Sequence, residues 1–250
     1  IDARLASSST VPSPTVDHYQ QPGNYVDSIS VDGVDRWFTI HLPPGYEPGV
    51  PVPLVLNLHP YTGTAFSQES LSRMQAKADQ EGFVVVNPQA LHAPPAWWGP
   101  LPGEDGKPDR DFFEQLVPYL QGRISIDPDR IYATGMSNGG TMSYRLGCEM
   151  SATLAAIAPV AGGHVAHPLC KPEAPISVLV VHGTEDWVIP DHGNDTDSPP
   201  VRAWLENWAR HNGCDAAPTT SQPYESVILD LWSGCDGGTS VQLLTLEGGG

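Results

Sequence analysis

The sequence predicts an α/β fold in which helices cover both faces of a mostly parallel sheet, with an antiparallel hairpin at its start. Apolar runs of strand length alternate with helix-like segments along the chain. Most of these runs are continuously apolar, as in strands that are buried on both faces. The 250 residues are 40% hydrophobic, which suits one large domain and argues against a disordered chain.

Turn and breaker residues delimit the individual elements. Asp32-Gly33 is a two-residue hairpin signal, Gly82 ends a helix, and Pro118 should kink or shorten another helix. The expected strands are 26–31, 37–42, 53–59, 83–87, 130–135, one within 154–161, 176–181 and 241–246. The expected helices are about 67–80, 109–123, 138–150 and 200–211. Residues 88–108 are rich in Pro and Gly and should form a long, functional loop.

The domain organisation is expected to be simple. Residues 1–22 should form a flexible segment, because Ser7 to Thr15 resembles the stretch that follows a cleaved leader. Residues 23–250 contain no internal repeat and no change of composition that would mark a second domain. We therefore expect one domain over 23–250, in a chain that has been processed or trimmed.

The charge balance excludes some classes of partner. There are 29 acidic and 12 basic residues, a formal net charge of −17. Such a surface repels phosphate backbones, and no basic run is present that would hold an anionic membrane. We expect neither nucleic-acid nor membrane binding, and interpret the acidity as a source of solubility.

The four cysteines favour disulfides over a metal site. Cys148, Cys170, Cys214 and Cys235 include no C-x-x-C pair, so zinc binding has little support and no metal is expected. Local pairing, Cys148 with Cys170 and Cys214 with Cys235, would close two short loops, each stabilising by roughly 3 kcal/mol in the chain-entropy model. Four buried free thiols are the alternative. Disulfides would place the protein outside the cytosol.

One motif points to nucleophilic catalysis. Gly135-Met136-Ser137-Asn138-Gly139 fits G-x-S-x-G and lies between an expected strand and an expected helix, as this motif requires. The turn pushes the serine hydroxyl out above the sheet, and side chains at the glycine positions would collide with neighbouring backbone. The helix that follows directs its N-terminus at a developing oxyanion. We expect Ser137 to be a nucleophile; the alternative is an ordinary glycine-rich helix start.

A carboxylate and a set of backbone donors complete the pattern. Asp186 follows a buried strand, downstream of the serine, where it could orient an imidazole. Glu185 is the alternative residue for this role. If neither has a catalytic role, the segment is a solvated acidic turn. His59-Pro60-Tyr61 follows the first buried strand, where such sites place an oxyanion donor. Pro60 has no N–H, so we expect Tyr61 and Asn138 to donate their backbone N–H groups.

Several motifs together resemble a known family. They are 135–140, 156–162, 182–186 and 246–250, and they are similar to secreted esterases of the polyhydroxybutyrate depolymerase and feruloyl esterase group, in the first carbohydrate esterase family. The resemblance covers about Val26 to the end. It implies the α/β-hydrolase fold, ester hydrolysis through an acyl-enzyme without a cofactor, and the two local disulfides.

The sequence departs from that family in two places. The family has His-Gly where this chain has His59-Pro60. The family's catalytic histidine follows the glycine run, whereas this chain stops at Gly250, so we expect the catalytic domain to be truncated there. His59 and His182 occupy positions where the family has structural histidines. His192 is the least implausible substitute base, and none of the other six, His18, His41, His92, His164, His167 and His211, fits that position.

Weaker features concern substrate and ion binding. Trp97, Trp98 and Trp187 could form an aromatic platform for a phenolic or sugar group or could cover the core; for Trp187 the pattern favours the core. Asp191, Asn194, Asp195 and Asp197 could in principle bind calcium, but a solvated acidic loop suits their spacing better. Asn194-Asp195-Thr196 is a glycosylation sequon.

Taken together, these features predict an extracellular, monomeric serine esterase. Its substrates would be hydroxycinnamoyl or acetyl esters of plant polysaccharide or related aryl esters, with a short polyester such as polyhydroxybutyrate as the alternative. A protein of another class, a catalytically dead homologue that binds ligand in a retained pocket, is the competing interpretation.

Overall fold

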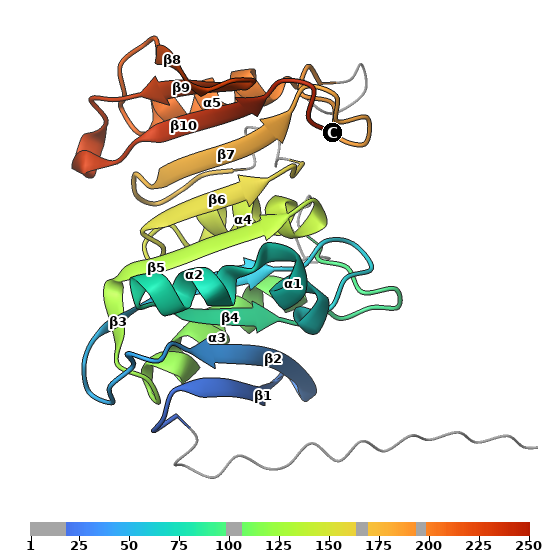
Figure 1. Ribbon diagram of the computed structural model, residues 1–250, viewed down its shortest axis with the longest axis vertical. Coiled ribbons are helices and arrows are strands. Elements are labelled where there is room, and N and C mark those ends of the chain that lie inside the picture. The colour runs from blue at the N-terminus through green and yellow to red at the C-terminus, as the bar shows by residue number, and fades with distance from the viewer. Residues whose placement is uncertain (1–18, 99–106, 164–169, 194–198) are drawn as a thin grey trace, which may run out of the picture.

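The computed structural model describes residues 19–98, 107–163, 170–193 and 199–250. Ten strands form one sheet in the order β1-β2-β4-β3-β5-β6-β7-β10-β9-β8. The strands from β4 to β10 in this order are parallel, and antiparallel pairs lie at both edges (Figure 1). The predicted mostly parallel sheet and its leading hairpin are therefore confirmed.

Strand bounds lie close to those expected from the sequence. The strands are β1 Gly23–Val31, β2 Val34–Leu42, β3 Val52–Leu58, β4 Val84–Pro88, β5 Ile126–Met136, β6 Ala156–Val160, β7 Ser177–Gly183, β8 Thr219–Tyr224, β9 Val227–Trp232 and β10 Val241–Leu246. In the β1–β2 hairpin, Val31 pairs with Val34, and Asp32 and Gly33 both have positive φ, as a type I′ turn requires. The pair β8–β9 was not predicted.

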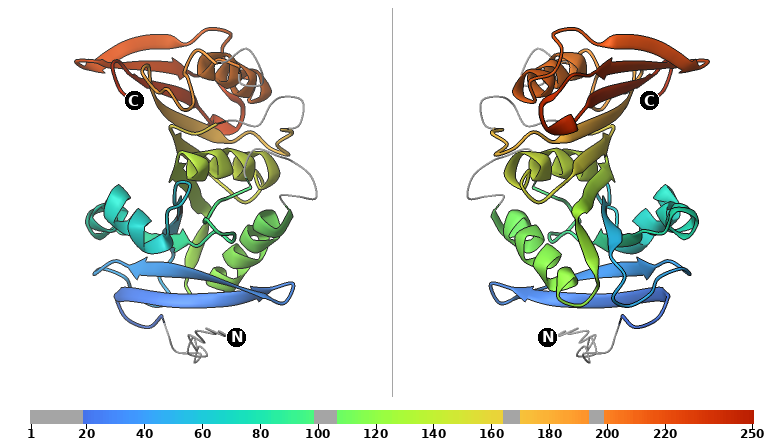
Figure 2. Two further views of the ribbon diagram at one scale, coloured as in Figure 1. Left: turned by 90° about the vertical axis from the view of Figure 1, so that its right-hand side faces the viewer. Right: turned by 90° about the vertical axis from the view of Figure 1, so that its left-hand side faces the viewer.

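The helices divide between the two faces of the sheet. They are α1 Ala65–Ser72, α2 Met74–Glu81, α3 Lys107–Gln121, α4 Asn138–Glu149 and α5 Val201–His211. Helices α3, α4 and α5 lie on one face, and α1 and α2 lie on the other, over β3 and β4 (Figures 1 and 2). The main core fills the space between the sheet and α3, α4 and α5. The exposed Pro118 does not end α3, which continues to Gln121.

The single helix expected over 67–80 is wrong, because the chain breaks at Arg73. Arg73 has φ 52° and ends α1 immediately before α2 begins. The Ser72 hydroxyl donates to the Gln68 carbonyl and accepts from the Met74 N–H and the Asn57 amide. The α1 N-terminus is closed by a capping box between Thr64 and Ser67, and Gly82 ends α2 as predicted.

The expectation that helices cover both faces fails for half of the sheet. Within the described part of the chain, no helix lies over β6, β7, β10 and β9 on the side of α1 and α2 (Figures 1 and 2). The apolar side chains that point to this side are only half-buried. They include Ala158, Val160, Leu179, Val181, Leu229 and Leu244. A continuous apolar strand pattern does not reveal which face a helix covers.

No helix of the described residues is long and apolar enough to cross a membrane.

Candidate active site

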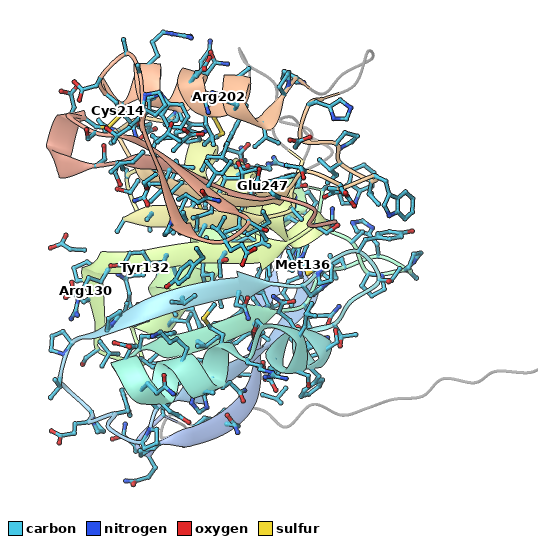
Figure 3. All side chains as sticks on the ribbon, turned by 45° about the horizontal axis from the view of Figure 1, so that its top comes forward. Arg130, Tyr132, Met136, Arg202, Cys214 and Glu247 are labelled. Carbon is cyan, nitrogen blue, oxygen red and sulfur yellow. A yellow bond between two sulfur atoms is a disulfide. The ribbon has the colours of Figure 1, made fainter. Side chains whose placement is uncertain are left out.

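The candidate residues lie in segments that begin where the parallel strands end, at the carboxyl end of the sheet. Leu58 of β3 pairs with Gly135 of β5, and Gly183 of β7 pairs with Leu246 of β10. The segments that follow these strands therefore lie at the same carboxyl end of the sheet (Figure 1). They are 59–63, 137–140, 184–189 and 247–250. Figure 3 shows β5 running from Arg130 to Met136, the residue before Ser137. This is the edge at which open α/β sheets bind their ligands.

Ser137 occupies a strained turn between β5 and α4. Its φ and ψ are 54° and −119°, outside the helical and extended regions for a residue with a side chain. Its N–H donates to the Val160 carbonyl of β6 at 2.8 Å, and its carbonyl accepts from the Thr141 N–H at 2.9 Å. Neighbouring structure thus holds a conformation that the residue alone disfavours.

The glycines around Ser137 are needed for close packing. A Cβ on Gly139 would lie 2.3 Å from the Leu58 carbonyl oxygen, and one on Gly135 would lie 2.6 Å from the Gly139 carbonyl carbon. A Cβ on Gly140 would lie 2.9 Å from the Val160 oxygen. These contacts are shorter than real Cβ atoms show, which confirms the collision expected from the sequence.

His59 is a structural histidine at the end of β3. Its ring is buried, Nδ1 donates to the Pro60 carbonyl at 2.8 Å, and Nε2 accepts from the Ala90 N–H at 3.1 Å. This pattern assigns the neutral Nδ1–H tautomer. Burial lowers the pKa of His59, and both ring nitrogens are engaged by backbone groups, so neither is free to take a proton from Ser137.

The two expected oxyanion donors remain open in the loop and at the helix start. In the 59–63 loop the Thr62 N–H donates to the Pro95 carbonyl and the Gly63 N–H donates to the Pro60 carbonyl, both at 2.9 Å. Among hydrogen bonds within the described ranges, the backbone N–H groups of Tyr61 and Asn138 have no acceptor. The Tyr61 side chain is exposed at this edge.

Asp186 is held at the end of β7 by its own turn. Its Oδ1 accepts from the N–H groups of Val188 and Ile189 at 2.9 and 2.8 Å. Its Oδ2 lies 3.4 Å from His182 Nε2, which donates to the Ile189 carbonyl at 2.7 Å. His182 is buried and braces this turn, a structural role that agrees with the resemblance.

The last residues of the chain run along the Asp186 turn. The Glu185 N–H donates to the Gly249 carbonyl at 2.7 Å, and the Gly248 N–H donates to Thr184 Oγ1 at 2.9 Å. A Cβ on Gly250 would lie 2.7 Å from the Glu185 carbonyl oxygen. The chain thus reaches Gly250 beside the backbone of Glu185 and Asp186.

Among the described residues, no histidine forms a hydrogen bond or an ion pair with Ser137. His192 is 80% exposed and pairs with Asp191 at 3.2 Å, rather than with Asp186. His41 bonds Asn24 and Asp79, away from this edge. His164 and His167 lie outside the described residues, as do Asn194, Asp195, Thr196 and Asp197 of the expected calcium or glycosylation loop.

The three candidate tryptophans have three different environments. Trp97 is buried, and its ring packs against His59 and Phe113. Trp98 is 39% exposed, and its ring packs at a tilt against His92. Trp187 is 85% exposed next to Asp186, so the sequence interpretation that favoured core packing for Trp187 is wrong. A long-range partner decides burial, and the sequence around Trp187 carries no sign of one.

The disulfide pairing is confirmed. Cys148 is joined to Cys170, and Cys214 is joined to Cys235. The first bridge ties the end of α4 to the segment before β7, and the second ties the residues after α5 to those before β10.

Comparison with known proteins identifies the group. No family model matches the chain. The chain is 30% identical over 228 residues to "Feruloyl esterase B" of Piromyces equi, covering 86% of this chain and 42% of that protein. It is 28% identical over 223 residues to a bifunctional acetylxylan esterase/xylanase of Neocallimastix patriciarum, covering 87% and 31%. It is 30% identical over 249 residues to "Putative esterase NocK" of Nocardia uniformis subsp. tsuyamanensis, covering 89% and 72%.

The chain belongs to the same family of esterases as these relatives. It spans less than half the length of the first two relatives. Solved structures agree on the fold of this esterase family. An acetyl xylan esterase from Aspergillus awamori superimposes with a TM-score of 0.67 at 16% identity, covering 88% of this chain and 92% of that one. A thermostable esterase gives 0.64 at 20% identity, covering 90% and 54%.

The sequence does not reveal the contacts that hold the loops around Ser137 together. The side chain of Asn138 bonds the backbone of Trp97, and Asp109 with Arg145 bonds the backbone of Trp98. The partners are far apart in the sequence, and of these residues only Asn138 belongs to a motif. Only the placement of Asn138 next to Ser137 could have drawn attention to it.

Proposed function

We propose that the protein is a serine carboxylic-ester hydrolase that works through an acyl-enzyme. The observation that carries this proposal is the strained backbone of Ser137 at the start of α4. The glycines around it lie at positions where a side chain would collide with neighbouring backbone. A serine with φ 54° is disfavoured unless its surroundings enforce it, and such turns cluster at functional sites. The names of the relatives support ester hydrolysis.

In the proposed reaction the Ser137 hydroxyl attacks the ester carbonyl carbon while a base removes its proton. The carbonyl oxygen becomes an oxyanion, which accepts hydrogen bonds from the N–H groups of Tyr61 and Asn138. Collapse of this intermediate breaks the ester C–O bond, and the alcohol leaves with the proton. Water then hydrolyses the acyl-enzyme by the same steps, and no cofactor is required.

Asp186 is proposed to orient the base, an imidazole, and to stabilise its cation. Its Oδ1 is engaged by two backbone N–H groups, so the oxygen proposed to accept from the imidazole is Oδ2, which also lies 3.4 Å from His182 Nε2. In a longer form of the chain, a residue after Gly250 would begin beside Asp186, and a histidine there would complete the triad. Comparing ester hydrolysis by the 250-residue chain and by a chain carrying a histidine-containing extension tests this position.

The proposed substrates are hydroxycinnamoyl or acetyl esters on plant polysaccharide, and related aryl esters. Trp98 and Trp187 support this assignment, because their indole rings are exposed and flank the proposed nucleophile and acid segments. Release of ferulate from a feruloylated xylan and of acetate from an acetylated xylan are the assays to compare. Faster hydrolysis of poly(3-hydroxybutyrate) than of both would favour the polyester alternative instead.

An extracellular location and a monomeric state are part of the proposal. The two disulfides support an oxidising compartment.

Labelling with a fluorophosphonate probe tests the nucleophile. We expect the ester-hydrolysing form of the protein to be labelled at Ser137, and Ser137→Ala to lose both labelling and hydrolysis. Ser233→Ala, at an exposed serine directly after β9, should be labelled like the parent protein. Labelling at another serine contradicts the assignment, and a folded, full-length protein that is not labelled supports the ligand-binding alternative.

A further inference from the structure

A short segment, residues 95–98, lies between the two pieces of chain that carry the proposed oxyanion donors. We call it the bridge. On one side it bonds the 59–63 loop twice. The Thr62 N–H donates to the Pro95 carbonyl at 2.9 Å, and the Trp97 indole Nε1–H donates to the His59 carbonyl at 3.0 Å. The two bonds lie on either side of Tyr61 in the sequence, so they hold the loop before and after its proposed donor.

On the other side the bridge bonds the residue after the nucleophile. Asn138 Oδ1 accepts from the Trp97 N–H at 2.7 Å, and Asn138 Nδ2 donates to the Trp97 carbonyl at 2.8 Å. One side-chain amide therefore satisfies both backbone groups of one residue. This pairing needs a donor and an acceptor on the same short side chain, which among the amino acids at this reach means Asn.

Buried charges fix the bridge to the body of the protein. The Trp98 N–H donates to Asp109 Oδ2 at 2.9 Å, and the Trp98 carbonyl accepts from an Arg145 guanidinium N–H at 2.6 Å. Asp109 also pairs with Arg36 at 2.8 Å, and Arg145 pairs with Glu149 at 3.0 Å. Arg36, Asp109 and Arg145 are almost completely buried. Buried, paired charges have few alternative arrangements, so the bridge is a rigid reference point.

We propose that the bridge sets the position of the Tyr61 N–H relative to the Asn138 N–H, with Trp97 and the Asn138 side chain as positioning residues. This inference rests on the proposed function. The two donors come from different segments, yet an oxyanion must lie about 3 Å from both. The bridge is bonded to both segments through one residue, Trp97, and so transmits the position of one to the other. Neither side chain needs to touch substrate in this role.

The test is a double-mutant cycle on the ester-hydrolysing form of the protein. Asn138→Ala removes both amide bonds, and Trp97→Phe removes the bond to His59 while keeping an aromatic ring. Each should lower kcat by about 10- to 100-fold, because displaced oxyanion donors lose transition-state stabilisation. KM should change by less than about threefold, because ground-state binding is not involved. The double variant should be no more than about twofold slower than the slower single variant.

Two further variants separate positioning from general destabilisation. Asn138→Asp keeps the acceptor for the Trp97 N–H, but it sets a carboxylate oxygen against the Trp97 carbonyl and a negative charge beside the proposed oxyanion, so its kcat should be no higher than that of Asn138→Ala. Trp208→Phe truncates an equally buried indole on α5, and should lower the melting temperature without changing kcat. If Trp97→Phe does not fold, the two Asn138 variants carry the test, because Asn138 is only half-buried. The affinity of a boronic acid, which mimics the tetrahedral intermediate, should fall in step with kcat.

The outcomes distinguish this inference from the function on which it rests. Ser137→Ala is measured in the same assay. If it remains as active as the parent, the proposed nucleophile is wrong. If Ser137→Ala is inactive while Asn138→Ala keeps the parent kcat, the nucleophile stands and the bridge is overturned. Effects that multiply in the double variant, or that appear in KM with kcat unchanged, also overturn the bridge, because they indicate independent contacts with substrate.

Discussion

The two halves of the sheet hold their parts of the site in different ways. The nucleophile half comprises β1 to β5, α1 to α4 and the segments 59–63, 95–98 and 137–140. The acid half comprises β7 to β10, α5 and the segments 184–189 and 247–250. The nucleophile half has helices on both faces and buried ion pairs, whereas one face of the acid half has no helix over it in the described part of the chain.

The difference concerns which contacts can give way. Around Ser137 the closest neighbours are backbone atoms of central strands, whose positions are fixed on both sides. Around Asp186 the neighbours are its own turn and a run of three glycines, and Trp187 and Val188 extend into solvent. We infer that the nucleophile half is rigid and tolerates little change, and that the acid half adjusts. The predictions below test this contrast.

Adding one methyl group to each half should have very different effects. In Gly139→Ala the new Cβ would meet the Leu58 carbonyl at 2.3 Å in a central strand, and in Gly183→Ala it would meet the Gly249 carbonyl at 2.2 Å. Leu58 cannot move without breaking the sheet, so we expect Gly139→Ala to lose more than about 4 kcal/mol or to fail to fold. Gly249 lies in a glycine run, so Gly183→Ala should lose about 1–3 kcal/mol. Equal losses in urea unfolding would contradict the contrast.

Removing the charge of the proposed acid should affect catalysis and leave folding nearly intact. We expect Asp186→Asn to lower kcat by about 10³- to 10⁴-fold, because the imidazole loses its orienting carboxylate. The amide oxygen still accepts from the Val188 and Ile189 N–H groups, so the melting temperature should change little. Glu185→Gln is the matched control and should keep the parent kcat. The reverse result would assign the role to Glu185.

The two halves differ in how deeply an aspartate ion pair is buried. Asp109 and Arg36 are 2% and 1% exposed, whereas the Arg202 that pairs with Asp230 is 47% exposed. Asp109→Asn leaves a buried guanidinium uncompensated, so we expect a loss of about 3–5 kcal/mol. Asp230→Asn should lose less, because Arg202 can turn to solvent. Chemical unfolding of both variants measures the difference, and a larger loss for Asp230→Asn would show that the acid half is the more tightly held.

The sequence predicts the nucleophile half better than the acid half, for physical reasons. The turn at Ser137, its glycines and the hairpin at Asp32-Gly33 depend on local backbone conformation, which residue types reveal. The β8–β9 hairpin has no such signal. β8 is polar and contains Pro223, and the connecting turn uses Ser226 at φ 61° instead of glycine. The break at Arg73 likewise depends on the hydrogen bond that Ser72 accepts from Asn57, 15 residues away in the sequence.

The site itself divides along the same line. The proposed roles of Ser137 and Asp186 follow from motifs, and the cysteine pairing follows from short spacing and family resemblance. The contacts of the bridge join Asn138 to Trp97 and Asp109 to Trp98, so they arise only once the chain has folded. The exposure of Trp187 also depends on the folded structure, because no sequence pattern reveals which apolar side chain will have no other part of the chain packed over it.

The smallest expected effect is a loss of stability at alkaline pH in the nucleophile half. The buried Asp27 accepts hydrogen bonds from Tyr19 at 2.6 Å and from Tyr119 at 2.7 Å, linking β1 to α3. Burial and then the bond to Asp27 raise the pKa of Tyr119 from 10.0 to about 12, and the same two causes raise the pKa of Tyr19. Because the Tyr119 phenol is held neutral in the folded state, its contribution is complete below pH 10, the unfolded value, and is lost as the pH rises towards 12.

Tyr119→Phe isolates the share of one phenol. At pH 8 it should be less stable than the parent by about 1 kcal/mol, because one hydrogen bond to Asp27 is missing. Between pH 10 and 12 the parent should lose stability faster than the variant, so the two unfolding free energies converge. Tyr224→Phe, at an exposed tyrosine of β8 in the acid half, should run parallel to the parent over the whole range. If Tyr119→Phe also runs parallel to the parent, the phenol at Tyr119 does not control the alkaline loss, and this part of the nucleophile half is no more sensitive to pH than the acid half.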